Sequence, residues 1–419
     1  MKNKEKKKAT GEHKPNWKEV YATPEDIKAF LADRIYLRHN VITGRVECRI
    51  PSSYEHDGTE WQPISDRIVN SLWTELSKEK PTRAQDIYRV IESDFVPDFH
   101  PFRHYLDRLP PWNGENHILA MSLSVQVKGG VDEQMRFADY LTKWLVGMVA
   151  GWIDESVVNN VILVLIGEQG SYKTTWFNYL LPPELSRYFY TKTNANRMGR
   201  DDLLTLAQYG LVCCEELDTM RPSELNQLKA AVTMPSIDER AAYAHFHEHR
   251  KHIASFCGTG NNAQFLSDPT GNRRWLPFEV DSILSPRENP FDYEGIYSQA
   301  YALYQQGFQF WFGQTEIQRL AVHNRQFETP QIEQELVDVF FRKPLDKEVG
   351  EYMPVSRAMQ IIGGSITQHI NASRLGQAFT LQGFEFKRTS HSRGYIVVQR
   401  DAGEIKSHLT KLAEDGRVF

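Results

Sequence analysis

Apolar positions along the chain follow two spacings, which together predict a protein of mixed helices and strands. The continuous apolar run at 161–166 is typical of a buried strand, and shorter apolar runs end near 214 and 260. Apolar residues at helical spacing cover 137–154 and 293–312. We therefore expect an α/β fold whose core begins near residue 155.

The region before this core, 17–154, contains short mixed elements and is interpreted as an α+β accessory or oligomerisation domain. Its use for ring contacts, a collar or a partner platform is left open. Residues 1–16 are rich in lysine and are expected to form a disordered basic tail. The expected elements of the accessory domain are helices at 23–32, 65–77 and 82–91, and a hairpin that turns at Thr43-Gly44.

A polar stretch at 342–350 predicts a linker, and a smaller unit follows it. Two helices and a hairpin are expected there, so we interpret 351–400 as a winged-helix-like domain with 372–381 as its recognition helix. Residues 401–419 are expected to form a helical tail. A small winged fold can bind nucleic acid or mediate protein contacts. The expected phosphate contacts of its wing are Lys387, Arg388 and Arg393.

Composition limits the function classes. The 419 residues are 41% hydrophobic and 25% charged, as in soluble globular proteins of two or three domains. No apolar run reaches about 18 residues, so no membrane partner is expected. The net charge of −5 excludes a generally basic nucleic-acid binder, so such contacts must come from local patches. The cysteines lack metal or disulfide spacing, which favours a reducing cytoplasm: Cys48, Cys213, Cys214 and Cys257.

Residues 161–175, VILVLIGEQGSYKTT, combine a buried strand, a glycine-rich turn and the start of a helix. This order is typical of a loop that binds nucleotide phosphates. Its glycines let the backbone approach phosphate oxygens, Lys173 would reach the β- and γ-phosphates, and Thr174 would place a hydroxyl on Mg²⁺. The expected nucleotide contacts are Gly167, Gln169, Gly170, Ser171, Tyr172, Lys173, Thr174 and Thr175.

This loop departs from the usual GxxxxGK[ST] pattern at one position, because Tyr172 stands where glycine precedes the lysine. The alternative is an ordinary strand–turn–helix with a chance Lys-Thr pair. We favour the phosphate loop because the strand, the turn glycines, Lys173 and the helix follow in the right order.

Two later strands end in polar residues that fit the other half of an ATP site. LVCCEELD ends in Glu215 and Glu216, the first for the metal and the second to activate water. A strand that ends in solvated acids is the alternative. The strand HIASFCGTGNN ends at Asn261, which would hold the attacking water or sense the γ-phosphate. Asn262 in that role, or a plain turn, is the alternative there.

Basic residues near these strands suggest two further roles. Arg273 and Arg274 precede an apolar strand and suit an arginine finger that enters a neighbouring subunit, or else a structural surface turn. Residues 235–252 interleave basic and aromatic side chains, as in loops that grip a phosphate backbone and stack on bases. A charged hairpin without a ligand is the alternative, and a metal site is disfavoured. The candidate contacts are His245, His247, Arg250 and Lys251.

Taken in order, these motifs resemble the virulence-associated E family, in the superfamily 3 helicase branch of AAA+ ATPases from phages and mobile elements. The resemblance rests on GEQGSYKTTWFNYLLP, LVCCEELDTM, IDERAAYAHF and FCGTGNNAQFLSDPTGNRRWLPFEV. It is strongest over 159–280 and extends more weakly from about 30 to about 341. It implies a three-layer αβα AAA+ P-loop core at 155–341, with ATP and Mg²⁺ as cofactors.

The resemblance also implies a homo-oligomeric ring, with a hexamer favoured, and a pore hairpin that pulls on DNA and maps to 245–251. Tyr172 and the glutamate at 215, where aspartate is commoner, bear on the strength of catalysis. The implied roles are nucleotide and Mg²⁺ contacts for Lys173 and Thr174, an acidic pair for Glu215 and Glu216, a sensor for Asn261 and a trans arginine for Arg273 or Arg274.

The expected function is that of a DNA-stimulated ring ATPase or helicase that acts on single-stranded or forked DNA in replication of a phage or mobile element. The alternative is a defence or regulatory switch that binds ATP without unwinding DNA. A structural DNA-binding protein with a relic core fits less well, since acidic pair, sensor and arginines are all present. No primase motif stands out in the first 150 residues, so a primase or other replication partner is expected on another chain.

Overall fold

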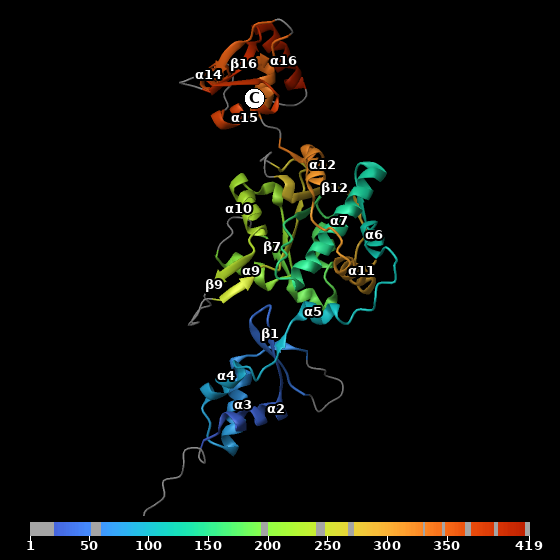
Figure 1. Cartoon of the computed structure of the whole chain (residues 1–419), viewed down its shortest axis with the longest axis vertical. Coiled ribbons are helices and arrows are strands. Elements are labelled where there is room, and N and C mark those ends of the chain that lie inside the picture. The colour runs from blue at the N-terminus through green and yellow to red at the C-terminus, as the bar shows by residue number, and fades with distance from the viewer. Residues whose placement is uncertain are drawn as a thin grey trace, which may run out of the picture. The chain divides into compact units, whose positions relative to one another are not determined.

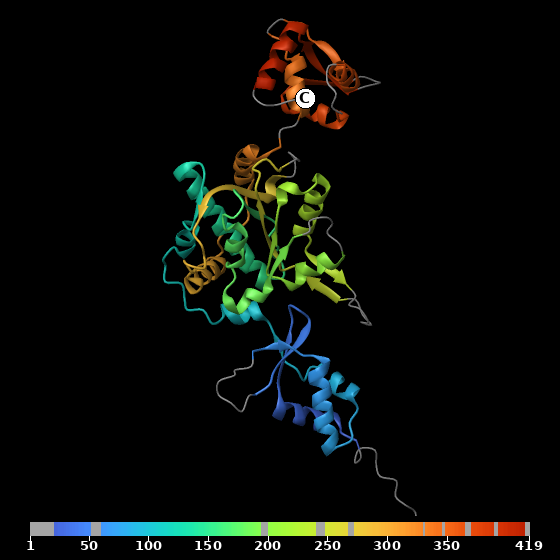
Figure 2. The same cartoon turned by 180° about the vertical axis from the view of Figure 1, so that it is seen from behind.

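The computed structural model describes most of the chain, and Figures 1 and 2 show it from two sides. Contacts divide the chain into two compact units, 1–261 with 273–320 and 262–272 with 321–419. The first unit combines the expected accessory region with most of the expected ATPase core. The described residues are 21–51, 60–193, 200–239, 248–266, 272–329, 332–345, 348–364, 370–388 and 393–414.

The amino-terminal part of the first unit packs three helices against one face of a small sheet. Its helices begin and end close to the predicted positions, and Thr23 caps the first helix in a capping box with Asp26. The sheet order is β3-β2-β1-β4. The elements are α2 (Pro24–Arg34), β1 (Tyr36–Asn40), β2 (Arg45–Arg49), β3 (Gln62–Pro63), α3 (Asp66–Glu79), α4 (Ala84–Ile91) and β4 (Asp98–Phe99).

The rest of the first unit is built on a six-stranded sheet of order β5-β12-β6-β11-β8-β7. Neighbouring strands are parallel except at the β5 edge, which pairs antiparallel with β12. The predicted α/β fold with a buried apolar strand at 161–166 is confirmed. The strands are β5 (Val125–Val127), β6 (Ile162–Ile166), β7 (Phe189–Lys192), β8 (Leu211–Cys214), β11 (Ser255–Gly260) and β12 (Trp275–Ile283).

The long helix α7 (Gly130–Ile153) holds one face of this sheet, and α11 (Tyr293–Gln305) packs on α7 (Figure 1). Two buried tryptophans of α7 fix the contact. The indole N–H of Trp144 donates to the carbonyl of Phe256, and that of Trp152 donates to the carbonyl of Gly210, both at 3.0 Å. Each buried indole therefore contributes apolar area without leaving its N–H unsatisfied.

Shorter elements complete the first unit. A hairpin of β9 and β10 follows α10, and four residues on each strand are paired antiparallel. Within the described residues, no helix has both the length and the apolar character needed to cross a bilayer. The elements are α5 (Pro101–Leu106), α6 (His117–Ser122), α8 (Lys173–Asn178), α9 (Arg200–Gln208), α10 (Pro222–Val232), β9 (Ser236–Glu239) and β10 (Glu248–Lys251), and α12 (Gln314–Asn324) begins in this unit and ends in the second.

The second unit contains two helices followed by a hairpin, in the order predicted for 353–400. The expected recognition helix coincides with α15. Strand β16 pairs with β13, β14 and β15, and a separate apolar cluster forms the core of this unit. The elements are α13 (Ile332–Phe340), β13 (Phe341–Arg342), β14 (Glu351–Pro354), α14 (Val355–Gly363), α15 (Ala372–Leu381), β15 (Glu385–Arg388), β16 (Arg393–Gln399) and α16 (Ala402–Glu414).

Candidate functional site

The loop between β6 and α8 has the local geometry of a phosphate-binding turn. Gly170 has a φ of +86°, a region that glycine adopts without strain. A Cβ on Gly167 would lie 3.1 Å from the carbonyl oxygen of Val280, so a side chain there would require the loop or β12 to shift by a few tenths of an ångström. Backbone N–H groups of such a loop and of the helix start that follows it can face an anion.

Lys173 is buried at the start of α8, and the loop itself holds its ammonium group. Its Nζ donates to the carbonyls of Gly167 at 2.8 Å and Glu168 at 2.7 Å, and to Ser171 Oγ at 3.2 Å. A fourth acceptor, Asn261 Oδ1 at 3.5 Å, comes from the end of β11. Burial lowers the pKa of Lys173, and the carboxylate of Asp218 acts in the opposite direction.

The acidic pair lies at the same edge of the sheet as this loop. Strand β11 separates β6 from β8, and all three strands run parallel, so their carboxyl ends meet. A cavity of about 390 Å³ forms there. Its lining contains Thr259, Gly260 and most of the predicted nucleotide and catalytic residues, namely Gln169, Gly170, Ser171, Tyr172, Lys173, Thr174, Thr175, Glu215, Glu216 and Asn261.

Sequence reasoning did not select Thr259 and Gly260, which also line this cavity. Gly260 accepts a hydrogen bond from the Gly167 N–H at 3.1 Å and so ties the phosphate loop to β11. Their position directly before Asn261 is the sequence signal that could have identified these two residues. Among the described residues, no three His, Cys, Asp or Glu side chains form a metal-binding group. Mg²⁺ sites that rely on one carboxylate and on substrate phosphates need no such group.

Two residues of the cavity carry an unusual backbone conformation. Tyr172 has a φ of +63° and Glu216 a φ of +55°, and no other described non-glycine residue has a positive φ. This left-handed region is costly for residues with a Cβ, which explains why glycine is usual where Tyr172 stands. The Tyr172 side chain is 47% exposed. Backbone strain is therefore concentrated on the two loops that face each other across the site.

The arginines Arg273 and Arg274 lie away from this cavity. They precede β12, whose first residue, Trp275, pairs with Ile162 at the start of β6. The phosphate loop follows the other end of β6, roughly 13 Å further along the strand at about 3.3 Å per residue. Arg273 is exposed and Arg274 is half-buried. The fold does not bring either arginine to the nucleotide loop of its own chain.

The basic hairpin of β9 and β10 is only partly described, and His245 and His247 lie outside the described residues. Arg250 donates to the carbonyl of Ile42, and Lys251 donates to the carbonyls of Gly151 and Asp154 at the end of α7. Burial lowers the pKa of Lys251 to about 8. Both cations are held by the chain's own carbonyls, and their predicted contact with nucleic acid stays a prediction.

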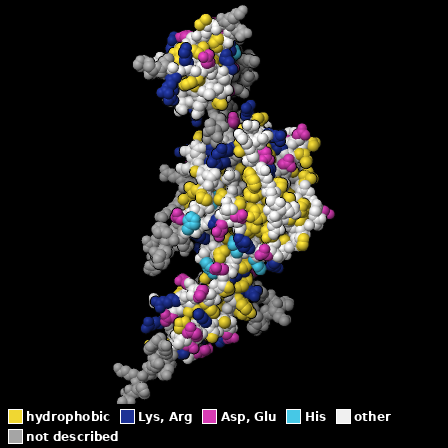
Figure 3. Space-filling view, viewed as in Figure 1, with side chains coloured by type: hydrophobic (Ala, Val, Ile, Leu, Met, Phe, Trp, Pro, Cys, Tyr) yellow, Lys and Arg dark blue, Asp and Glu magenta, His cyan; other side chains and the backbone are white. Residues whose placement is uncertain are grey.

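The predicted wing residues lie on the hairpin of the second unit. Lys387 and Arg388 are exposed on β15, and Arg393 begins β16 opposite Arg388. Phe386, which sequence reasoning did not select, is 54% exposed beside them. Figure 3 shows several Lys and Arg side chains on the surface of this unit. The hairpin thus presents cations and one aromatic ring on the same short segment.

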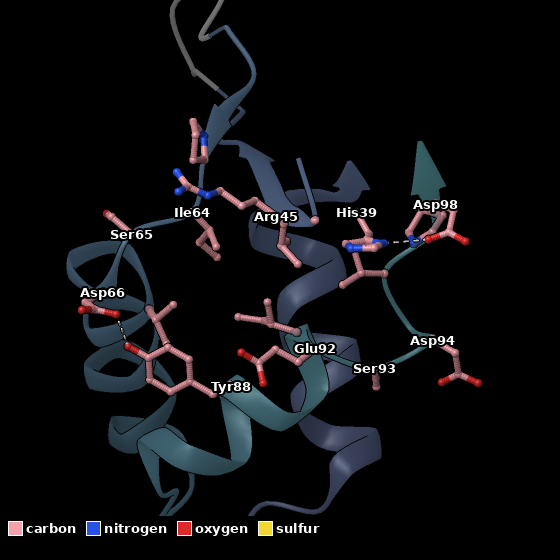
Figure 4. A pocket seen from close by; sticks show the side chains of 17 residues that line it. His39, Arg45, Ile64, Ser65, Asp66, Tyr88, Glu92, Ser93, Asp94 and Asp98 are labelled. Atoms are coloured by element: carbon pink, nitrogen blue, oxygen red, sulfur yellow. Dashed lines mark hydrogen bonds and ion pairs between the residues drawn. The ribbon is translucent and has the colours of Figure 1, made fainter. Parts of the chain in front are cut away.

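A larger cavity, of about 800 Å³, lies in the amino-terminal part of the first unit (Figure 4). Carboxylates surround it, two of them in contacts with other lining residues. His39 Nδ1 lies 2.8 Å from Asp98 Oδ1, and Tyr88 Oη donates to Asp66 Oδ1 at 2.9 Å. These acids would repel a phosphate group, and no glycine-rich loop or buried lysine lines the cavity. The smaller cavity at the end of β6 is therefore the better candidate for a nucleotide.

Comparisons with known proteins agree with the motifs. The model of the virulence-associated protein E-like domain matches residues 106–329, more than half of the chain. No curated protein sequence matches. One similar solved structure is the apo structure of the NrS-1 C-terminal region, 13% identical, covering 90% of this chain and 99% of that chain with a TM-score of 0.47.

An A-form apo structure of the same region is 14% identical, with the same coverage and a TM-score of 0.49. A mutant of RuvB from Thermotoga maritima is 12% identical, covers 61% of this chain and 91% of that chain, and has a TM-score of 0.25. The family model carries the assignment, because it spans the phosphate loop, the acidic pair and the arginine segment. The chain belongs to the family of proteins with a virulence-associated protein E-like domain.

Proposed function

We propose that the chain is a Mg²⁺-dependent, DNA-stimulated ring ATPase and helicase that acts in DNA replication of a phage or mobile genetic element. One observation carries this proposal. The buried ammonium of Lys173 contacts Asn261, and the cavity around them also contains Glu215 and Glu216. Lysine, acids and amide from three parallel strand ends are the set that ATP hydrolysis requires.

In the proposed reaction, the loop at 167–172 binds the phosphates through its backbone N–H groups. Lys173 exchanges its carbonyl partners for phosphate oxygens and neutralises their charge. Thr174 and Glu215 would hold Mg²⁺, which supplies further charge neutralisation when bound. Glu216 orients the attacking water, and Asn261 donates its amide N–H to the water or the γ-phosphate.

The site would be completed by a neighbouring subunit. Arg273 lies at the amino-terminal ends of the parallel strands, whereas its own phosphate loop follows the carboxyl end of β6. We therefore propose that it acts in the next subunit of a ring, with six subunits favoured. An arginine in this role stabilises the charge that develops on the transferred phosphoryl group. Assembly would then be a condition for turnover.

Nucleic acid would be contacted by the wing of the second unit and by the tip of the β9–β10 hairpin, on single-stranded or forked DNA. The exposed cations Lys387, Arg388 and Arg393 support the first contact. A primase or other replication partner is proposed on a separate chain.

The test is the ATPase rate with and without single-stranded DNA, for the wild type and Lys173→Ala, over a range of protein concentrations. We expect turnover that rises with DNA, rises steeply with protein concentration and is lost in the variant. Strand separation on a forked duplex would then be measured. An ATPase rate that does not change when DNA is added, or that is retained in Lys173→Ala, would refute the proposal.

A second candidate function is a nucleotide-dependent switch that binds ATP without unwinding DNA. The left-handed backbone at Tyr172 and Glu216 favours it, since strained residues at a ligand site can hold two alternative loop arrangements. Tight ATP binding with negligible turnover under every condition would support this function, and DNA-stimulated turnover with strand separation would exclude it.

A further inference from the structure

Five side chains on one face of the amino-terminal sheet form a stack in which aromatic rings alternate with guanidinium groups. Arg49 lies 5.0 Å from the ring centroid of Tyr36 and 5.5 Å from that of Trp61. Arg38 lies 4.0 Å from the ring centroid of Trp61 and 3.6 Å from that of Phe99. All four distances are in the range of cation–π contacts.

Strand register places this stack on the face that the helices do not cover. Leu37 and Cys48 are paired across β1 and β2, and both pack into the apolar cluster formed with the helices. Tyr36 and Arg49 form the adjacent pair. Successive side chains of a strand point to opposite faces, so Tyr36 and Arg49 lie on the open face.

The two ends of the stack differ in charge and exposure. Arg38 forms an ion pair with the buried carboxylate of Glu47 at 2.7 Å. Arg49 is exposed, and within the part of the chain that the structure describes its contacts are with the two rings, with no ion pair. Tyr36 is 51% exposed. The stack therefore ends in an open ring and a guanidinium whose charge no described carboxylate balances.

We propose that this face is a binding site for single-stranded DNA, in which a base stacks on Tyr36 and a backbone phosphate binds Arg49. The choice of DNA rests on the proposed function, but binding here needs neither ATP nor the phosphate loop. A base presents a ring face that only an unpaired strand leaves open, so a base stacked on Tyr36 would lengthen the stack by one ring at its exposed end. Guanidinium groups stack on rings and bind phosphate at once.

The experiment measures binding of a fluorescently labelled oligothymidylate to the full chain, by anisotropy, without nucleotide. We expect Tyr36→Ala to weaken binding about tenfold, since one base–aromatic stack is worth ~1–3 kcal/mol and ~1.4 kcal/mol is tenfold. Tyr36→Phe should bind like the wild type, because the ring is kept. The matched control is Tyr21→Ala, which removes a ring that is 46% exposed outside the stack.

A second pair of variants tests the phosphate contact. Arg49→Ala should weaken binding and lower the slope of log K against log salt by about one. Arg89→Ala, which removes an exposed arginine of α4 that pairs with Asp86, should leave the slope unchanged. Crosslinking with 4-thiothymidine oligonucleotides should map to Tyr36 or Trp61.

The results separate this site from the proposed ATPase. Losses that are equal for Tyr36→Ala and Tyr21→Ala, or crosslinks that map elsewhere, would overturn the site even if ATP turnover responds to DNA. Selective loss in Tyr36→Ala, with binding retained in Lys173→Ala, supports the site even if no turnover is found. Tighter binding of oligouridylate than of oligothymidylate would overturn the assignment to DNA.

Discussion

Tyr172, which stands where the phosphate-loop motif usually has glycine, adopts a left-handed backbone conformation. Its φ of +63° is the conformation that glycine would adopt at little cost, whereas a residue with a Cβ loses about 1–2 kcal/mol there. We expect Tyr172→Gly to unfold with a free energy about 1 kcal/mol higher than Tyr172→Ala, because both lack the ring and only alanine keeps the strain. Urea denaturation of the two variants measures this difference.

The control pair is Tyr179→Gly and Tyr179→Ala, on the same helix. Tyr179 has a φ of −83°, which suits alanine, so there the alanine variant should be the more stable by about 0.5–1 kcal/mol. A preference of the same sign at both positions would show that the angle at Tyr172 does not cost stability.

Lys251 gives a prediction on pH. Burial lowers its pKa from 10.5 to about 8, so between these values the unfolded chain holds a proton that the folded chain has lost. Stability rises with pH where the unfolded state binds more protons. The free energy of unfolding of the wild type relative to Lys251→Met should therefore increase from pH 8 to pH 10.5, as measured by urea titrations.

Lys128 provides the opposite case. Its hydrogen bond to Glu279 raises its pKa, so its contribution is present below 10.5 and is lost as pH rises through the folded value. The free energy of unfolding of the wild type relative to Lys128→Met should therefore decrease at high pH. Parallel pH curves for the two variants would mean that at least one of the two lysines does not titrate as its surroundings imply.

At the scale of elements, the joint between β2 and the turn at Pro183–Tyr188 depends on one carboxylate. Glu47 is buried and accepts hydrogen bonds from Arg38, Arg187 and Asn40. Burial alone would raise the pKa of Glu47, but these hydrogen bonds and the charge of Arg187 lower it overall. Removing one partner from a buried ion pair costs about 3–5 kcal/mol, because the other charges stay buried.

We therefore expect Glu47→Gln to lower the free energy of unfolding by about 3 kcal/mol. Limited proteolysis should cut the variant between the amino-terminal sheet and α7 sooner than the wild type. Glu279→Gln, which breaks a solvent-screened pair with Lys128, should cost much less than Glu47→Gln. Equal losses in the two variants would show that Glu47 does not carry the joint.

The elements also show what sequence alone could and could not provide. Local signals sufficed for α2, where Thr23 and Pro24 mark the start, and for the turn between β6 and α8, where glycines and Lys173 follow a buried strand. The three-residue strand β5 has too few positions to show a spacing, so it was not predicted. The partners of Lys251 could not be predicted from the sequence, because Gly151 lies 100 residues away and only the fold brings the two together.

The whole molecule sets the last prediction, because strand order decides which parts of an ATP site one chain can supply. The acids, the amide and the lysine meet at the carboxyl ends of β6, β8 and β11. Arg273 instead precedes β12, at the end of the sheet where these parallel strands begin. A head-to-tail ring would place the arginine edge of one subunit against the nucleotide edge of the next. Lys173→Ala and Arg273→Ala should each abolish DNA-stimulated turnover alone.

Mixed in equal amounts and allowed to exchange subunits, the two variants should recover turnover at about a quarter of the interfaces, where an intact Lys173 meets an intact Arg273. The control mixes Lys173→Ala with a chain that carries both substitutions, so no interface holds both groups and no turnover returns. If Arg273→Ala is active alone, or if the exchanged mixture stays inactive, the arginine does not complete its neighbour's site. Recovery in the first mixture only would require an active site shared between two chains.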